Sequence, residues 1–221
     1  MAILLYCAAE RGDAETATIA GVGGQPVFCI EHSGVVLFCS QNTGSDAWAK
    51  PALADSVKQF HAVLRQVFAN QAILPFRFPT ILADEKEAAD HLRKEAAQYE
   101  TQLRRFADDA QMEVVITDRS EGESNGQARS GTEYLREKQR REERCRLAAN
   151  AIQDLSAELA RDWKQRHTRN GLRLFALVKR DSVPRFLDLV RTFSVPPGLA
   201  VRVTGPWPVT EFAEMKQDSH G

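Results

Sequence analysis

The chain has 221 residues, which is enough for one large domain or for two small domains that each have a core. Its formal net charge is −1 at pH 7, so no overall electrostatic field draws it to nucleic acid or to an anionic membrane. Its apolar content is ordinary for a globular protein, and no apolar run approaches the roughly 20 residues that span a bilayer.

The first segment, Ile3 to Ala9, is a short apolar run that predicts a central strand. Met1 leads directly into it without a basic region or a cleavage site, so we expect no signal peptide. The cysteines form no C-x-x-C pair and no metal-ligand spacing with histidine, so we expect buried free thiols in a reducing cytoplasm and no metal or cofactor. They are Cys7, Cys29, Cys39 and Cys145.

The next segments predict a loop and then a hairpin. Glu10 to Gln25 is polar and rich in glycine, but a strand rather than a helix follows it, which argues against a phosphate-binding loop. Val27–Ile30 and Val35–Ser40 flank a turn and predict two strands that are apolar on both faces. Such a sheet must be covered on both faces. We expect helices on one face and a second domain or a partner subunit on the other.

A helix is predicted from Pro51 to about Asn70, with His61 beside its apolar stripe as a structural histidine. The segment Ile73 to Ile81 follows, and its two prolines predict an edge strand or an extended crossing segment. Alternation would place Arg77 on the face opposite its two phenylalanine neighbours. Arg77 is then an exposed edge residue, or else it forms an ion pair between domains or contacts a partner.

Two long helices are predicted in the second half of the chain. The first begins at Asp84, with Glu87 in capping-box register, and runs to Phe106 with a narrow apolar seam suited to another helix. The second runs from Ser130 to about Thr168, capped by Ser130 and Glu133. Its second half carries an apolar stripe at helical spacing: Ala148, Ile152, Leu155, Leu159 and Trp163.

The first half of that second helix, Arg136 to Arg144, has charged residues on every side and no apolar stripe. We therefore expect a helical rod that is anchored by its second half and projects its first half. Its seam could pair with the seam of the preceding helix.

The remaining segments complete an α+β fold. Met112–Thr117, Leu172–Val178 and Leu199–Val203 predict strands, and a short helix starts near Ser182. Strands joined through helices fit a ferredoxin-like arrangement, and the first part of the chain repeats the idea with the Glu10–Gln25 connection in place of a helix. We expect an N-terminal α+β domain over 1–82, with hairpin, helix and edge strand, and a C-terminal α/β domain with long helices over 83–221.

The last strand runs into Thr204-Gly205-Pro206-Trp207-Pro208, where two prolines hold a tryptophan in a fixed direction. Large aromatic side chains are highly buried on average, which favours Trp207 as a core plug that closes the sheet. The other interpretation is that Trp207 is presented to a partner.

This closing pentapeptide resembles the closing motif of the gas vesicle protein F/L family. Three further segments resemble motifs of that family, in the same order along the chain. Ile3–Ala8 resembles its opening strand, Leu74–Ile81 resembles its LP-x-RF-x-T segment, and Ser130–Leu135 resembles its SG-x-x-YL helix start. His61 and Leu64 resemble its H-x-x-(V/L) pattern.

The chain departs from the family pattern at two places. It has Val209-Thr210 where the family usually continues with Pro-Tyr, and it has Pro79 where a glycine usually stands.

The resemblance implies a minor gas vesicle protein, non-enzymatic, that supports shell assembly in the cytoplasm. Its implied partners are the small apolar main shell subunit and other minor gas vesicle proteins, with self-association as a further option and with no nucleic acid or membrane. A mixed-charge helix with few aromatic residues fits protein contacts better than RNA. The candidate partner-binding residues are Arg77, Tyr134, Arg136, Arg140, Arg144 and Trp207.

The alternative is a small enzyme or ligand-binding protein on a ferredoxin-like scaffold that uses Arg77, His61 or a cysteine. Against it, the sequence offers no paired carboxylates, no metal-ligand spacing and no thiol–histidine spacing.

Overall fold

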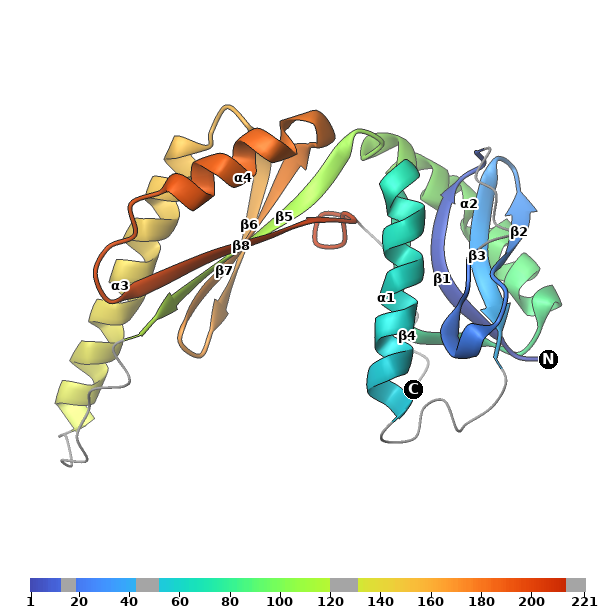
Figure 1. Cartoon of the computed structure of the whole chain (residues 1–221), viewed down its shortest axis with the longest axis horizontal. Coiled ribbons are helices and arrows are strands. Elements are labelled where there is room, and N and C mark those ends of the chain that lie inside the picture. The colour runs from blue at the N-terminus through green and yellow to red at the C-terminus, as the bar shows by residue number, and fades with distance from the viewer. Residues whose placement is uncertain (13–18, 43–51, 120–130, 214–221) are drawn as a thin grey trace. The chain divides into compact units, whose positions relative to one another are not determined.

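The structure, a computed structural model, describes residues 1–12, 19–42, 52–119 and 131–213. Its contacts divide the chain into two compact units. Unit 1 is Met1–Ala107 together with the segment from Pro208 onward, and unit 2 is Asp108–Trp207. Each unit contains one four-stranded sheet with helices packed on it (Figure 1). The α+β class that the sequence predicts is confirmed.

Unit 1 is built on an antiparallel sheet of order β2-β3-β1-β4. Its strands are β1 (Ile3–Glu10), β2 (Phe28–His32), β3 (Val35–Gln41) and β4 (Ile73–Leu82). The predicted hairpin is present: His32 pairs with Val35, and Ser33 and Gly34 make a tight turn with φ of 49° and 79°. This register places Cys29 opposite Phe38.

Both faces of this sheet are covered by helices of the same unit, α1 (Ala52–Asn70) and α2 (Glu85–Arg105). Alternate residues of β3, such as Leu37 and Cys39, pack in one cluster with the seam of α2. On the other face, Phe60 of α1 stacks on Tyr6 with ring centroids 5.2 Å apart. The expectation that a second domain or a partner must cover one face is therefore wrong, because α2 fills that place.

α2 begins as the sequence predicts. The Asp84 carboxylate accepts a hydrogen bond from the Glu87 amide at 2.8 Å, and the Glu87 carboxylate accepts one from the Ala83 amide at 2.6 Å. The apolar seam of α2, however, packs on the sheet of unit 1 and not on a second long helix. For this reason the contacts place α2 in unit 1, whereas the sequence suggests a domain boundary at residue 82.

Unit 2 has a sheet of order β6-β7-β5-β8, which is the strand order of a ferredoxin-like fold. Its elements are β5 (Asp109–Asp118), α3 (Gly131–Leu155), β6 (Ala160–Thr168), β7 (Gly171–Lys179), α4 (Val183–Thr192) and β8 (Leu199–Trp207). Unit 1 repeats the same order, with the connection that contains the short 3-10 turn Val22–Gly24 where unit 2 has α3. The prediction that the first part of the chain repeats the ferredoxin-like arrangement is confirmed.

The prediction of one long helix from Ser130 to about Thr168 is wrong for its second half. α3 ends at Leu155, and β6 follows from Ala160 as an edge strand paired with β7 over its length. The apolar stripe misleads because a spacing of four between Leu159 and Trp163 fits both helical and strand periods. In the strand, Trp163 reaches Phe186 of α4, with ring centroids 6.0 Å apart. Ser130 lies outside the described residues.

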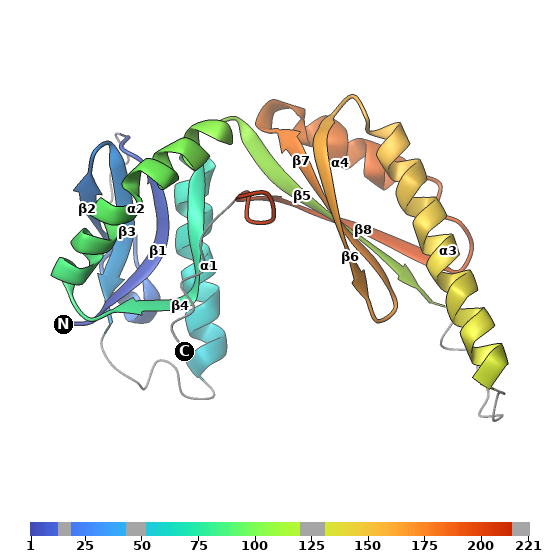
Figure 2. The same cartoon turned by 180° about the vertical axis from the view of Figure 1, so that it is seen from behind.

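α3 and α4 cover one face of the sheet in unit 2, and the first half of α3 extends past the end of that sheet (Figures 1 and 2). Its second half is anchored by four buried side chains, those of Cys145, Ala148, Ala149 and Ile152. The predicted projection of the charged half is therefore confirmed, on a shorter helix. None of the described helices combines the length and the hydropathy that crossing a bilayer requires.

After β8 the chain returns to unit 1. Val209 and Phe212 are buried there, with exposures of 3% and 5%, and Ala213 packs on the cluster that contains the α2 seam. This short segment contributes to the core of unit 1.

Candidate functional site

The charged half of α3 carries three of the predicted partner-binding residues. Tyr134 lies in its first turns, and the side chains of Arg136 and Arg140 are exposed. Neighbouring charges form ion pairs along the helix, with Glu137–Arg141 at 3.4 Å and Lys138–Glu142 at 3.9 Å. The exposed Lys138–Glu142 pair contributes at most about 1 kcal/mol, and the Glu137–Arg141 pair is partly buried. Because the exposed ion pair is weak, a partner that binds this helix surface can break it at little cost in free energy.

Arg144, also a predicted contact residue, lies at the boundary between the exposed and anchored halves of α3. Its guanidinium donates to the Asp118 carboxylate on β5 at 2.6 Å, and the Asp118 side chain is 3% exposed. Arg144 therefore ties α3 to the sheet. This structural role was not anticipated from the sequence, because Asp118 is distant along the chain.

Trp207 lies at the end of β8, and the core-plug interpretation is wrong. Its side chain is 39% exposed. Its indole nitrogen donates to the Thr204 hydroxyl at 3.3 Å, and Thr204 in turn donates to Glu113 at 3.4 Å on β5. Glu113 also pairs with Arg173 of β7 at 2.9 Å. This polar chain runs over the face of the sheet that the helices leave uncovered, and it holds the tryptophan at the surface.

Arg77 is exposed on β4, which is an edge strand as predicted. The alternation argument fails at this point. Phe76 packs edge-on to Tyr99 of α2 with ring centroids 6.1 Å apart, whereas Phe78 packs on Phe60 of α1 at 5.0 Å. The two phenylalanines serve opposite faces because the pairing of β1 with β4 is interrupted there by a register shift.

No carboxylate pairs with Arg77 among the residues described in unit 1. Its role as an ion pair between domains or as a partner contact stays a prediction.

The four cysteines are free, and three of them are buried. Burial raises the pKa of the Cys29 thiol to about 11 and that of the Cys7 thiol well above its ordinary value, so both stay protonated near neutral pH. Within the described ranges, no group of three or more His, Cys, Asp or Glu side chains is placed to hold a metal ion. His61 is exposed on α1 and meets the ring of Phe60 edge-on at 6.0 Å.

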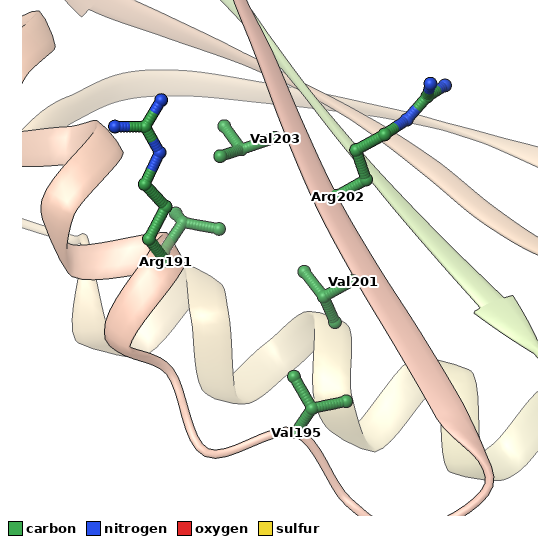
Figure 3. Close-up of a pocket in the computed structure, with 6 residues that line it drawn as sticks. Arg191, Val195, Val201, Arg202 and Val203 are labelled. Atoms are coloured by element: carbon green, nitrogen blue, oxygen red, sulfur yellow. The ribbon is translucent and has the colours of Figure 1, made fainter.

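A groove lies between α4 and β8 in unit 2 (Figure 3). It has a volume of about 290 Å³ and is lined by Val190, Arg191, Val195, Val201, Arg202 and Val203. Val195 and Val203 face it, whereas Arg202 points to the other side of β8. In the sequence, Val201, Arg202 and Val203 alternate in apolar and charged character, which is consistent with one face of the last strand turning toward an apolar groove.

The predicted candidates thus do not form one cluster. Arg77 belongs to unit 1, and the others belong to unit 2. Tyr134, Arg136 and Arg140 share the exposed half of α3, while Trp207 lies at the end of a strand.

A family model for the gas vesicle synthesis protein GvpL/GvpF matches residues 2–214. The chain belongs to the GvpL/GvpF family. No protein with a curated description matches the sequence.

Two crystal structures are similar in fold to this GvpL/GvpF family member. One is the gas vesicle protein GvpF from Anabaena sp. PCC7120, with a TM-score of 0.80 and 17% identity, covering 100% of this chain and 99% of that one. The other is GvpF from Microcystis aeruginosa, with a TM-score of 0.75 and 14% identity, covering 97% and 99%. At these identities the likeness concerns the fold alone, and both units take part in it.

Proposed function

We propose that this chain is a non-enzymatic accessory protein of gas vesicle assembly. It acts in the cytoplasm at the growing vesicle by binding the main shell subunit and other minor gas vesicle proteins. The family match over residues 2–214 is the observation that carries the proposal. The raised pKa of the half-buried Cys29 thiol disfavours the thiolate that the alternative, enzymatic role would need there.

The exposed half of α3 is the proposed contact element. It presents Arg136 and Arg140 together with Leu135, whose side chain is 58% exposed. Arginine and an adjacent apolar side chain suit a protein interface, where arginine is enriched and bulky side chains form anchors. Tyr134, on the same half of α3, is proposed as a further contact residue.

Arg77 and Trp207 are proposed as further contacts. Both are exposed, and each lies on an edge strand of its own unit. Trp207 is held in place by its hydrogen bond to Thr204, so its presentation costs little conformational entropy on binding.

The test is affinity capture of the tagged chain after co-expression with the main shell subunit and the minor gas vesicle proteins. We expect the wild type to retain the shell subunit and Arg136→Glu/Arg140→Glu to lose most of it. The matched control is Arg65→Glu/Lys94→Glu, an equal change of charge at exposed positions of α1 and α2. Failure of the wild type to retain any gas vesicle protein contradicts the proposal, and equal loss in the control removes α3 as the contact element.

A further inference from the structure

The groove between α4 and β8 differs from the rest of the covered face of unit 2. On the central strands, residues that face the helices are fully buried, as Val114 and Leu174 are at 0% exposure. On β8, the equivalent residues Val201 and Val203 are only partly buried. Val195, in the loop after α4, is 38% exposed. The helix layer therefore stops short of the sheet edge and leaves apolar surface open beside it.

β8 is also an edge strand, because it pairs with β5 on one side and ends the sheet on the other. Alternate residues of an edge strand direct unpaired N–H and C=O groups outward, where an extended segment can pair with them. Pro206 would interrupt such pairing near the end of β8, but Leu199 to Val203 contains no proline. The free edge and the open apolar surface thus lie along the same stretch of chain.

Two arginines flank this stretch, one on each side. Arg191 stands at the groove on α4, and Arg202 points to the opposite side of β8 (Figure 3). Both are exposed, and neither has a carboxylate partner among the residues that the structure describes. In the same unit, Arg144, Arg161 and Arg173 are each paired with an acidic side chain.

We propose that this edge takes up an extended segment of a partner protein in which apolar and acidic residues alternate. Residues of the added strand opposite Val201 and Val203 would face the groove and need apolar side chains. The residue between them would lie across from Arg202 and would pair with it as an acid. A further acidic residue at the groove end would meet Arg191. The inference rests on the proposed function, since it names a surface for the protein contacts proposed there.

A different protein fits this edge better than a second copy of the chain. Antiparallel pairing of β8 with itself, in the register that sets Val201 of one copy opposite Val203 of the other, would place the two Arg202 side chains opposite each other, and like charges there are destabilising. The edge strand β6 carries the exposed residues Lys164 and Arg166, whose positive charges would also repel Arg191 and Arg202. An acidic strand meets no such repulsion.

The experiment places a photo-cross-linking residue, p-benzoylphenylalanine, at Val195 in the full chain, co-expressed with the main shell subunit and the minor gas vesicle proteins. A second sample carries it at Arg185, which lies on α4 and does not line the groove. Mass spectrometry identifies the attached peptide. We expect position 195 to capture a segment of a gas vesicle protein with alternating apolar and acidic residues. We expect position 185 not to capture that segment.

Charge reversal then tests the arginines. In Arg191→Glu/Arg202→Glu we expect the cross-link from position 195 to fall by at least about tenfold, since like charges would face the acidic segment. The control Arg169→Glu/Arg185→Glu makes an equal charge change at exposed arginines of unit 2 and should leave the cross-link unchanged. Thermal unfolding should be the same for both variants, because all four arginines are exposed.

Three results overturn the inference: a cross-link unaffected by the reversal, capture of a second copy of this chain, or capture of a basic segment. A chain that binds gas vesicle proteins in affinity capture but gives no cross-link at position 195 refutes the groove alone. A chain that binds none of them refutes the proposed function as well.

Discussion

Trp207 and Phe212 are close in sequence but differ strongly in solvent exposure. Trp207 ends a strand of unit 2 with its side chain 39% exposed, whereas Phe212 is 5% exposed in unit 1. The sequence suggested the tryptophan as the core residue because of its size and its two flanking prolines. The structure gives that role to the smaller ring that follows.

We predict that Phe212→Ala lowers the free energy of unfolding by about 3 kcal/mol, the cost of truncating a buried phenylalanine. Trp207→Ala should lower it by less than about 1 kcal/mol, since exposed positions tolerate truncation. Urea unfolding of the two variants beside the wild type measures both values. A larger loss for Trp207→Ala than for Phe212→Ala would restore the core-plug interpretation.

The thiol of Cys29 leads to a prediction about how the stability of the chain changes with pH. Burial raises the pKa of its thiol to about 11 in the folded chain, above the ordinary value of 9.0. The folded state therefore favours the protonated thiol, and this contribution to stability is complete below about pH 9 and is lost as the pH rises to about 11. Cys29→Ser should remove that part of the loss, so the stability of the variant should fall less between pH 9 and 11 than that of the wild type.

The measurement is urea unfolding at a series of pH values, with Arg65→Gln as a control for general charge effects. An identical pH dependence in Cys29→Ser and the wild type would show that the thiol is not shielded from ionisation. Reaction with a thiol reagent at pH 8 gives a second reading, because a protonated thiol reacts slowly.

At the scale of elements, an ion pair joins the middle of α3 to β5, beside the buried apolar side chains of its second half. Arg144 and Asp118 meet at 2.6 Å, and the Asp118 side chain is almost fully buried. Because the Arg144 side chain is 41% exposed, the pair is partly screened by solvent, so its loss should cost less than that of a fully buried pair.

We predict that Arg144→Ala lowers the free energy of unfolding by roughly 2–3 kcal/mol, chiefly because the nearly buried Asp118 carboxylate loses its ion pair with Arg144. Arg140→Ala, on the exposed half of the same helix, should stay within about 0.5 kcal/mol of the wild type. Chemical unfolding gives both values, and Asp118→Asn should recover part of the loss in the Arg144→Ala background. Equal effects at the two arginines would contradict a structural role for Arg144.

The helices of unit 1 could be predicted well because local signals mark them. α1 and α2 begin and end close to the expected residues, and Asp84 and Glu87 cap α2 as predicted. The end of α3 could not be predicted, because no glycine or proline marks Leu155 and the charged residues of β6 carry no strand-like alternation. Pairing with β7, a contact distant in sequence, decides the conformation there.

The same limit applies to the candidate surface. Exposure of Arg136 and Arg140 follows from a local run of charge, which the sequence displays. The partners of Arg144 and of Trp207, and the groove beside β8, depend on how separate strands are placed in the sheet. Those contacts are visible only once the fold is known.

For the whole molecule, the informative feature is that one strand order occurs twice. Both units have the order of a ferredoxin-like sheet, and the chain passes between them twice, after Ala107 and after Trp207. The sequence predicted that both parts of the chain share one arrangement of strands, but it placed the domain boundary at residue 82, just before the helix that Asp84 caps. α2 looked free to pair with another long helix, and its packing on the first sheet could not be seen from its seam alone.

This chain belongs to the GvpL/GvpF family, and we propose that it supports gas vesicle assembly. The most direct test expresses a complete set of gas vesicle genes with and without this chain, and counts vesicles by electron microscopy and by the turbidity that is lost under pressure. We expect few or no vesicles without the chain, restoration by the wild type, and weaker restoration by Arg136→Glu/Arg140→Glu. Vesicles of unchanged number and pressure resistance in the absence of the chain would contradict it.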